Sequence, residues 1–268
     1  MHTSQALQDK RAVVFGGGGS IGAAVARALA SEGAEVFLAG RTLASVESVA
    51  QQIAAAGGRA YAEVVDALDD AVVDEYVDSV VKQAGGLDIE FNATGPRVTE
   101  YGNGKEALDL PVDEFITPVN TVLKSQFITA RAAARHMLGQ RSGVIVFLTG
   151  SPAKPHGPGT SGIGAAFGAV ENLVRTLAIE LGPAGVRVVG VRTAANPDTR
   201  TIQETLGLIG KMTNITPDQA ADGLAQSTML KVSPRTTDTA RAVAFLASDQ
   251  ARMLTGTVLN SSAGAVAD

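Results

Sequence analysis

Two hydrophobic periods alternate along the chain, and together they predict a repeating order of strands and helices. Short apolar runs typical of buried strands lie at residues 13–15, 35–39, 60–65, 87–95, 144–149, 186–191 and 256–260. Between most of them, apolar residues return every three or four positions, at 21–32, 43–56, 69–84, 163–181 and 237–248. Such an order with short connections is typical of a parallel sheet covered by helices on both faces. We therefore expect one doubly wound α/β domain over residues 1–268, with a parallel seven-stranded sheet and a substrate loop at about 194–232.

The first apolar run ends in four consecutive glycines, and helical spacing begins at Ile21. Glycine tolerates positive φ and lets backbone N–H groups approach a pyrophosphate, while the following helix directs its positive dipole end at the same place. The spacing G-x-G-x-x-G, followed by a second strand, is typical of a Rossmann-type dinucleotide site, although a purely structural glycine turn is the alternative. The predicted cradle consists of Gly16, Gly17, Gly18, Ser20, Ile21 and Gly22.

The second strand leads to Arg41, about 20 residues past the glycine turn, where a dinucleotide fold contacts the adenosine ribose. An acidic residue there would accept a hydrogen bond from the 2′-hydroxyl of NAD, whereas arginine offers a charge-assisted fork to the 2′-phosphate of NADP. Arg41 therefore favours NADP over NAD as cofactor. The alternative is an arginine that is merely solvated at the surface.

The composition limits the kinds of molecule that the chain is expected to bind. The net charge of −5 argues against nucleic acid or an anionic membrane as a partner, and no run of 18 apolar residues is present. The first ten residues lack the apolar core of a signal peptide, and the chain has no cysteine. We expect a cytoplasmic protein that acts on a small molecule, without disulfide or thiolate chemistry and without a metal site.

Several motifs give the chain a resemblance to the short-chain dehydrogenases/reductases over nearly its whole length. Residues 15–22 match the family's T-G-x-x-x-G-I-G, with Phe15 in place of threonine and Ser20 in place of the middle glycine. The segment 92–95 resembles the family's N-N-A-G, and residues 245–258 resemble its closing helix and last strand.

This resemblance implies further site residues. It places Asp66 and Ala67 beside the adenine, and Thr193, where the family has Pro-Gly, beside the nicotinamide. It implies that Ser151 is the family's catalytic serine and that Asn120 is its proton-relay asparagine. Further cofactor contacts are implied for Asn92, Ala93 and Thr94. The helices at 120–137 and 163–181 resemble those through which family members form dimers and tetramers, so a homo-oligomer is expected.

One motif departs from the family's pattern. The family's Tyr-x-x-x-Lys falls on Ile163 and Phe167, which can neither donate a proton nor hold a ribose. Losing a positioned acid commonly costs 10² to 10⁴ in rate. The three tyrosines, Tyr61, Tyr76 and Tyr101, lie far upstream in the sequence.

Other polar residues stand in the loop that follows the fifth strand, namely Ser151, Lys154, His156, Thr160 and Ser161. His156 is the best acid among them because its ordinary pKa lies near neutrality, although a loop histidine without any role is the alternative. Met212, Met229 and Leu230 belong either to a lid over the substrate or to the core.

Three functions remain open. The first is an NADP(H)-dependent oxidoreductase with a non-standard proton donor, which transfers hydride to or from a C=O, C=N or activated C=C bond. The second is a catalytically silent nucleotide-binding subunit. The third is a non-redox enzyme, such as a dehydratase or cyclase, that reuses the pocket.

Overall fold

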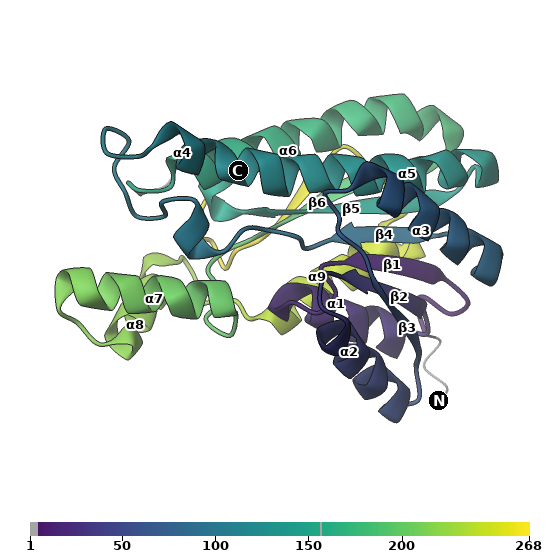
Figure 1. Cartoon of the computed structure of the whole chain (residues 1–268), viewed down its shortest axis with the longest axis horizontal. Helices are drawn as coiled ribbons and strands as arrows, with labels where there is room; N and C mark the ends of the chain where they lie inside the picture. The colour runs from purple at the N-terminus through teal and green to yellow at the C-terminus, as the bar shows by residue number, and fades with distance from the viewer. Residues whose placement is uncertain (1–4, 156) are drawn as a thin grey trace.

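The computed structural model of the chain describes residues 5–155 and 157–268, without the side chains of residues 209 and 211–213. Its seven strands form one parallel sheet in the order β3-β2-β1-β4-β5-β6-β7 (Figure 1). The strands are β1 (Arg11–Phe15), β2 (Glu35–Gly40), β3 (Arg59–Val64), β4 (Ile89–Asn92), β5 (Gly143–Gly150), β6 (Val186–Thr193) and β7 (Val258–Ser261). The predicted doubly wound α/β fold is confirmed.

Helices cover both faces of the sheet (Figure 1). One face packs against α1 (Ser20–Ser31), α2 (Leu43–Ala55) and α9 (Thr236–Ala247). The other packs against α3 (Asp70–Ala84), α5 (Lys124–Gln140) and α6 (Ser161–Leu181). Successive strand residues point to opposite faces, so Val14 joins the first core and Val13 and Phe15 join the second. The near-continuous apolar strands follow from this burial on both sides.

Three further helices lie around the carboxyl ends of the strands, namely α4 (Val112–Pro118), α7 (Arg200–Thr213) and α8 (Pro217–Ser227). The pair α7 and α8 projects beyond the sheet (Figure 1). The sequence predicted only helix and loop for residues 200–232. A π-helical turn, Val119–Leu123, joins α4 to α5 directly after Pro118, which lacks the N–H that a regular helix would use.

Helix α6 and the turn after it, Ser161–Ala184, form the one helical segment in the described residues with the length and hydropathy of a membrane span. This helix packs on β5 and β6, but only 39% of its most apolar window is buried. One side of an apolar helix is therefore not covered by the rest of the chain.

Two exposed rows of charge join α3 to α5. Asp70 and Asp74 pair with Arg131 and Arg135, and the His136 Nε2 atom lies 2.8 Å from Asp78 Oδ1. Exposed pairs of this kind contribute little each to stability.

A carboxyl group lies inside the sheet. Glu90 on β4 is 2% exposed, and its Oε1 atom has no hydrogen-bond partner in the described part of the chain. Burial raises the pKa of Glu90 to about 8, against a smaller lowering by Thr129. The side chain is therefore mostly neutral at pH 7, because a buried carboxylate without a cation would be far more costly than a buried acid.

Because the pKa of Glu90 is raised by folding, the free energy of unfolding should fall as the pH rises. Between its pKa in the unfolded chain, near 4.5, and about 8, the folded protein binds one proton more than the unfolded chain. The free energy of unfolding should then decrease by up to about 1.4 kcal/mol per pH unit across that window. Glu90→Gln, which cannot ionise, should lose this part of the slope.

Urea unfolding at pH 5, 6.5 and 8 measures how the free energy of unfolding changes with pH. Glu63→Gln, an exposed glutamate on β3, is the matched control and should keep the wild-type slope. Parallel pH profiles for the wild type and Glu90→Gln would contradict the buried-acid interpretation.

Candidate functional site

The turn between β1 and α1 is built around close backbone contacts. Gly16 has φ of +68°, and a Cβ there would lie 2.9 Å from the carbonyl carbon of Ala93. A Cβ on Gly22 would lie 2.3 Å from the carbonyl oxygen of Gly16, and one on Gly18 would lie 2.7 Å from Ser45 Cβ. The turn is also tied to β2, because the Gly17 N–H donates to the Ala39 carbonyl at 3.0 Å. Larger side chains at these positions would displace the backbone.

The helix that follows begins with open backbone donors. Gly19 is the N-cap of α1 and provides no side-chain cap, and the first turn holds no acidic residue. Ser20 is exposed and Ile21 is half-buried. Uncapped N–H groups and the positive end of the helix dipole together suit a bound phosphate. The turn lies between β1 and β4, where the strand order reverses and α/β sheets bind their ligands.

The loop after β4 closes onto this turn. The Ala93 N–H donates to the Phe15 carbonyl at 3.0 Å. Asn92 is buried, its Nδ2 donates to Thr129 Oγ1 at 3.1 Å, and its Oδ1 accepts from the Thr94 N–H at 2.7 Å. The Asn92 side chain therefore shapes the strand end, while Ala93 and Thr94 border the glycine turn.

Arg41 and Asp66 follow β2 and β3, two neighbouring strands, at the same edge of the sheet. Arg41 is exposed and makes no ion pair within residues 5–155 and 157–268. Asp66 Oδ1 accepts from the Leu68 N–H at 3.0 Å, which fixes a local turn, and Ala67 is buried behind it. The structure thus brings the predicted adenosine-side residues together along one row of strand ends.

At the end of β5 an aromatic ring lies beside a nearly covered serine. Ser151, directly after β5, is 4% exposed. A Cβ on Gly150 would lie 2.8 Å from Cε2 of Phe167, so that ring lies against the end of the strand. Ile163 and Phe167 are half-buried on α6 and pack against the core of that face. They offer no proton and no charge at this end of the sheet.

The remaining predicted catalytic residues are spread over two elements. Asn120 is exposed in the π-helical turn before α5. Thr160 donates to the Gly157 carbonyl at 2.9 Å, which holds the loop before α6. His156 lies outside the described residues, so its part stays a prediction, as does that of the Met212 side chain.

The loop after β4 and the loop before α6 are in contact, which the sequence did not suggest. The loop after β4 carries Tyr101 and then meets the loop before α6, where the Gly104 N–H donates to the Gly159 carbonyl at 2.9 Å. Tyr101 is 7% exposed, and burial raises its pKa to about 12. Such a phenol is a weaker acid than an ordinary tyrosine.

Thr193 is engaged within the protein. Its hydroxyl lies 2.9 Å from both Asn196 Oδ1 and Thr239 Oγ1, and Asn196 Nδ2 donates to the Pro234 carbonyl at 3.0 Å. This buried group ties the end of β6 to α9. The cofactor contact that the sequence predicts for Thr193 stays a prediction.

Sequence reasoning missed a buried charge group beside Ser151. Arg192 on β6 is 1% exposed and grips Glu171 of α6 through two hydrogen bonds, Nε to Oε1 at 2.7 Å and Nη2 to Oε2 at 2.9 Å. Its Nη1 donates to Asp268. The Lys154 Nζ lies 3.9 Å from the same Asp268 oxygen. The available signal was one charge on the core face of an apolar strand and an opposite charge on the core face of an apolar helix.

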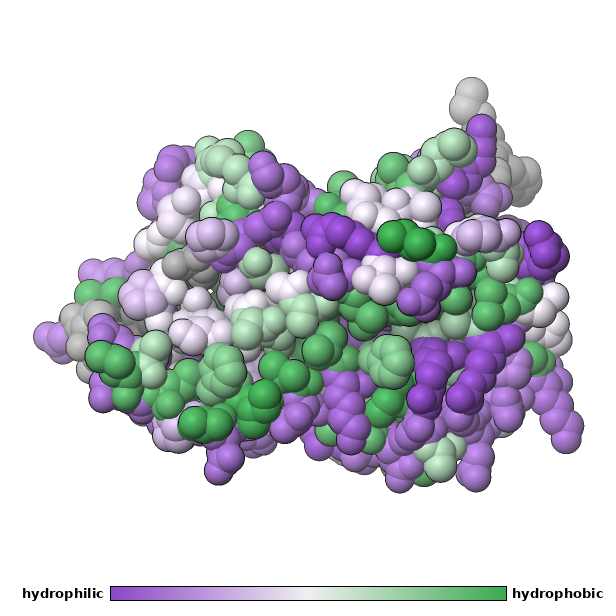
Figure 2. Space-filling model, turned by 90° about the horizontal axis from the view of Figure 1, so that it is seen from above, coloured by the Kyte–Doolittle hydropathy of each residue, from purple (hydrophilic) through white to green (hydrophobic). Residues whose placement is uncertain are grey.

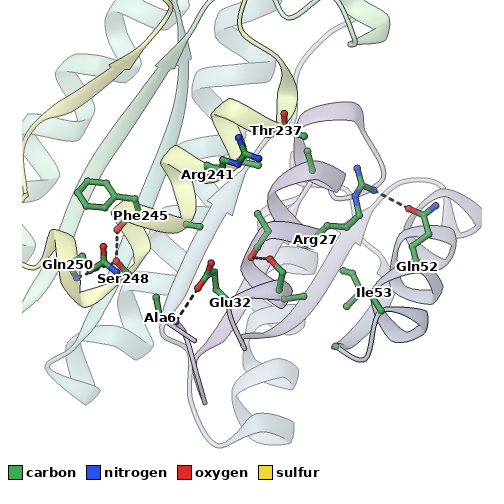
Figure 3. A pocket seen from close by; sticks show the side chains of 18 residues that line it. Ala6, Arg27, Glu32, Gln52, Ile53, Thr237, Arg241, Phe245, Ser248 and Gln250 are labelled. Atoms are coloured by element: carbon green, nitrogen blue, oxygen red, sulfur yellow. Dashed lines mark hydrogen bonds between the residues drawn. The ribbon is translucent and has the colours of Figure 1, made fainter. Parts of the chain in front are cut away.

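Two cavities flank α1. The larger, about 630 Å³, lies between α1, α2 and α9 and contains none of the predicted site residues (Figure 3). The smaller, about 420 Å³, opens at the glycine turn and is lined there by Gly18, Gly19 and Ser20. Arg27 and Gln52 line both and are joined by a hydrogen bond of 3.1 Å (Figure 3). The smaller cavity is the one that opens at the predicted phosphate cradle.

Several known proteins are similar to this chain in sequence. A family model described as Enoyl-(Acyl carrier protein) reductase matches residues 17–265. The chain is 34% identical to 4-formylbenzenesulfonate dehydrogenase TsaC1/TsaC2 of Comamonas testosteroni, over 96% of this chain and 98% of that protein. It is 30% identical to the 3-oxoacyl-(acyl-carrier-protein) reductase FabG of Staphylococcus epidermidis, again over 96% and 98%.

Solved structures agree in fold. A putative short-chain alcohol dehydrogenase from Sinorhizobium meliloti superposes with a TM-score of 0.85 at 26% identity, over 98% of each chain. NAD⁺-bound xylitol dehydrogenase superposes with a TM-score of 0.87 at 26% identity, over 95% of this chain and 98% of that one. With its glycine turn, its seven parallel strands and these relatives, the chain belongs to the short-chain dehydrogenase/reductase family of oxidoreductases.

Proposed function

We propose that the protein transfers hydride between NADP(H) and a small organic substrate that carries a C=O, C=N or activated C=C bond. The observation that carries this proposal is the turn at Gly16–Gly22, where Gly16, Gly18 and Gly22 have no room for a side chain and the following helix begins with N–H groups that no side chain caps. The names of two relatives specify a formyl and an oxoacyl group, which supports a carbonyl substrate.

Within this proposal the cofactor is held by backbone and by one cation. Gly16 to Gly22 would hold the pyrophosphate, with Asp66 and Ala67 beside the adenine and Asn92 to Thr94 beneath the adjoining ribose. The exposed guanidinium of Arg41 would bind the 2′-phosphate, which favours NADP over NAD. When bound, the nicotinamide supplies the hydride.

The proton must come from a group other than the family's tyrosine, because Ile163 and Phe167 are hydrocarbon. We propose that Ser151 lies beside the reacting atom and that water or the substrate completes the transfer with help from Asn120 or His156. An activated C=C or C=N bond needs less acid assistance than a ketone, so such substrates suit this site best.

We further infer a homo-oligomer, a dimer or tetramer. Figure 2 shows a band of apolar side chains on the face seen from above, where α5 and α6 lie in Figure 1. Phe127 on α5 is 41% exposed and Ile179 on α6 is 77% exposed. Burying such side chains between copies of the chain would be favourable. We propose, in addition, that the protein is a cytoplasmic enzyme of one domain and that residues 194–232 form its substrate loop.

Gly22→Val tests the cradle. The added side chain would collide with the Gly16 carbonyl, so the affinity for NADPH should fall at least tenfold, measured by quenching or enhancement of NADPH fluorescence. Gly139→Ala on α5, where a Cβ meets nothing within 4 Å, is the matched control and should bind as the wild type does. A folded Gly22→Val protein with unchanged affinity would contradict the proposed cofactor site.

Arg41→Ala tests the choice of cofactor. A charge-assisted hydrogen bond contributes about 1.5–3 kcal/mol, so NADPH affinity should fall roughly 10- to 100-fold while NADH affinity stays the same. The ratio of the two dissociation constants is the readout. Arg241→Ala, at an 81% exposed side chain on α9, controls for the loss of one positive charge. An unchanged ratio for Arg41→Ala would move the 2′-phosphate site elsewhere.

Ser151→Ala tests the proton path. Turnover with a panel of aldehydes, imines and enones, followed as NADPH consumption, should fall 10² to 10⁴-fold if the hydroxyl takes part in the transfer. Ser142→Ala, just before the opposite end of β5, is the control and should leave turnover unchanged. Equal rates in both variants would leave the transfer to water or substrate.

A further inference from the structure

The buried charge group beside Ser151 has one partner that differs from the others. Arg192 and Glu171 are almost fully buried, whereas the Asp268 side chain is 54% exposed. Asp268 also forms a long ion pair with Lys154, whose Nζ lies 3.9 Å from Oδ1 and whose side chain is 30% exposed. The buried Arg192 and the partly exposed Lys154 therefore share one carboxylate, that of Asp268, which solvent can reach.

The Arg192 guanidinium has two kinds of partner: a buried carboxylate on one edge and a partly exposed carboxylate at its remaining nitrogen. The edge formed by Nε and Nη2 is filled by Glu171, in the two-point arrangement that a carboxylate and an arginine prefer. The remaining donor, Nη1, is filled by Asp268 alone among the described residues. Hydrogen bonding to Arg192 holds the pKa of Asp268 below its ordinary value, so the group there is an anion.

The turn before Asp268 has hydrogen bonds of its own, although Asn260 contacts the Asp268 side chain as well. The preceding turn is held by Asn260 Nδ2, which donates to the Val266 carbonyl at 2.9 Å, and by the Met229 and Leu230 N–H groups, which donate to the carbonyls of Gly264 and Ala263. Beyond Val266, the described structure shows no backbone hydrogen bond. Asp268 is thus held through its side chain only.

If the Asp268 carboxylate leaves, the positive charge of Arg192 and Lys154 favours another anion in its place. The charges of Arg192, Lys154, Glu171 and Asp268 sum to zero, and Arg175, whose Nη2 lies 4.0 Å from Glu171 Oε2, adds a half-exposed positive charge. Departure of Asp268 therefore leaves an excess of positive charge around a nearly dry guanidinium. Leaving such a donor unpaired is costly, so another anion should enter.

We propose that Arg192 Nη1 and Lys154 Nζ form a binding subsite for the anionic group of the substrate, a carboxylate or sulfonate, and that Asp268 occupies this subsite when no substrate is bound. The subsite borders the reacting end of the sheet: Arg192 pairs in register with Thr149, and the Lys154 N–H donates to the Ser151 carbonyl at 3.1 Å. This inference rests on the proposed function only in calling the ligand a substrate.

Calorimetric titration without any nicotinamide tests the subsite. The probes are benzoate and benzenesulfonate, with benzamide as the neutral counterpart, and the proteins are the wild type, Asp268→Ala and Asp268→Asn. Removing the competing carboxylate should tighten binding of at least one anion tenfold or more and leave benzamide unchanged. The anion that gains more identifies the preferred group.

Two further variants serve as controls. Asp78→Ala removes an exposed partner of His136 on α3 and should bind like the wild type. Adding Lys154→Met to Asp268→Ala should abolish most of the gain. Asp268→Asn keeps the shape of the side chain, so it gives the answer even if Asp268→Ala is unstable.

Equal anion affinity in the wild type and both Asp268 variants, or an equal gain for benzamide, would overturn the subsite. Because no nicotinamide is present, that result is independent of the Gly22→Val and Arg41→Ala tests, and failure of those tests would leave the subsite standing.

Discussion

The rest of the site depends on how closely the backbone at Gly22 approaches the carbonyl of Gly16. That contact seats the first turn of α1 directly on the end of β1, so the helix starts at the bottom of the crevice where the strand order reverses. The open N–H groups and the dipole act there because no side chain intervenes. A single added methyl group would separate helix from strand and remove the seat for a phosphate.

Along the same row of strand ends, the two halves differ in character. From β3 to β4 the ends carry an exposed cation, an exposed carboxylate and open backbone donors. Between β5 and α6 they carry Phe167 over Gly150 and a serine that is almost covered. Polar chemistry resumes only one helical turn further along α6, at Glu171, and there it is paired with Arg192. The two halves thus differ in exposure: the charges at the first are at the surface, and those near the second are buried.

Local patterns predicted most of this architecture. Strand and helix periods follow from burial on one or both faces, so the seven strands and the glycine turn could be derived from neighbouring residues. Side-chain partners distant in sequence could not. Arg192 and Asp268 are 76 residues apart, and Thr193 meets Thr239 across 46 residues. Their contacts depend on how β6 packs against α6, α9 and the segment at 262–268. The internal partners of Thr193, and the contact between the loop after β4 and the loop before α6, join segments far apart in the sequence, so neighbouring residues carry no signal for them.

Helix α6 has a consequence for how the molecule responds to its surroundings. Its inner face holds Ile163, Phe167 and Glu171 against the strand ends, while its outer face leaves apolar side chains such as Ile179 uncovered. The same helix therefore borders the end of β5 on one side and presents hydrocarbon to its surroundings on the other, so a molecule that covers Ile179 would pack on the element that holds Phe167 against Gly150.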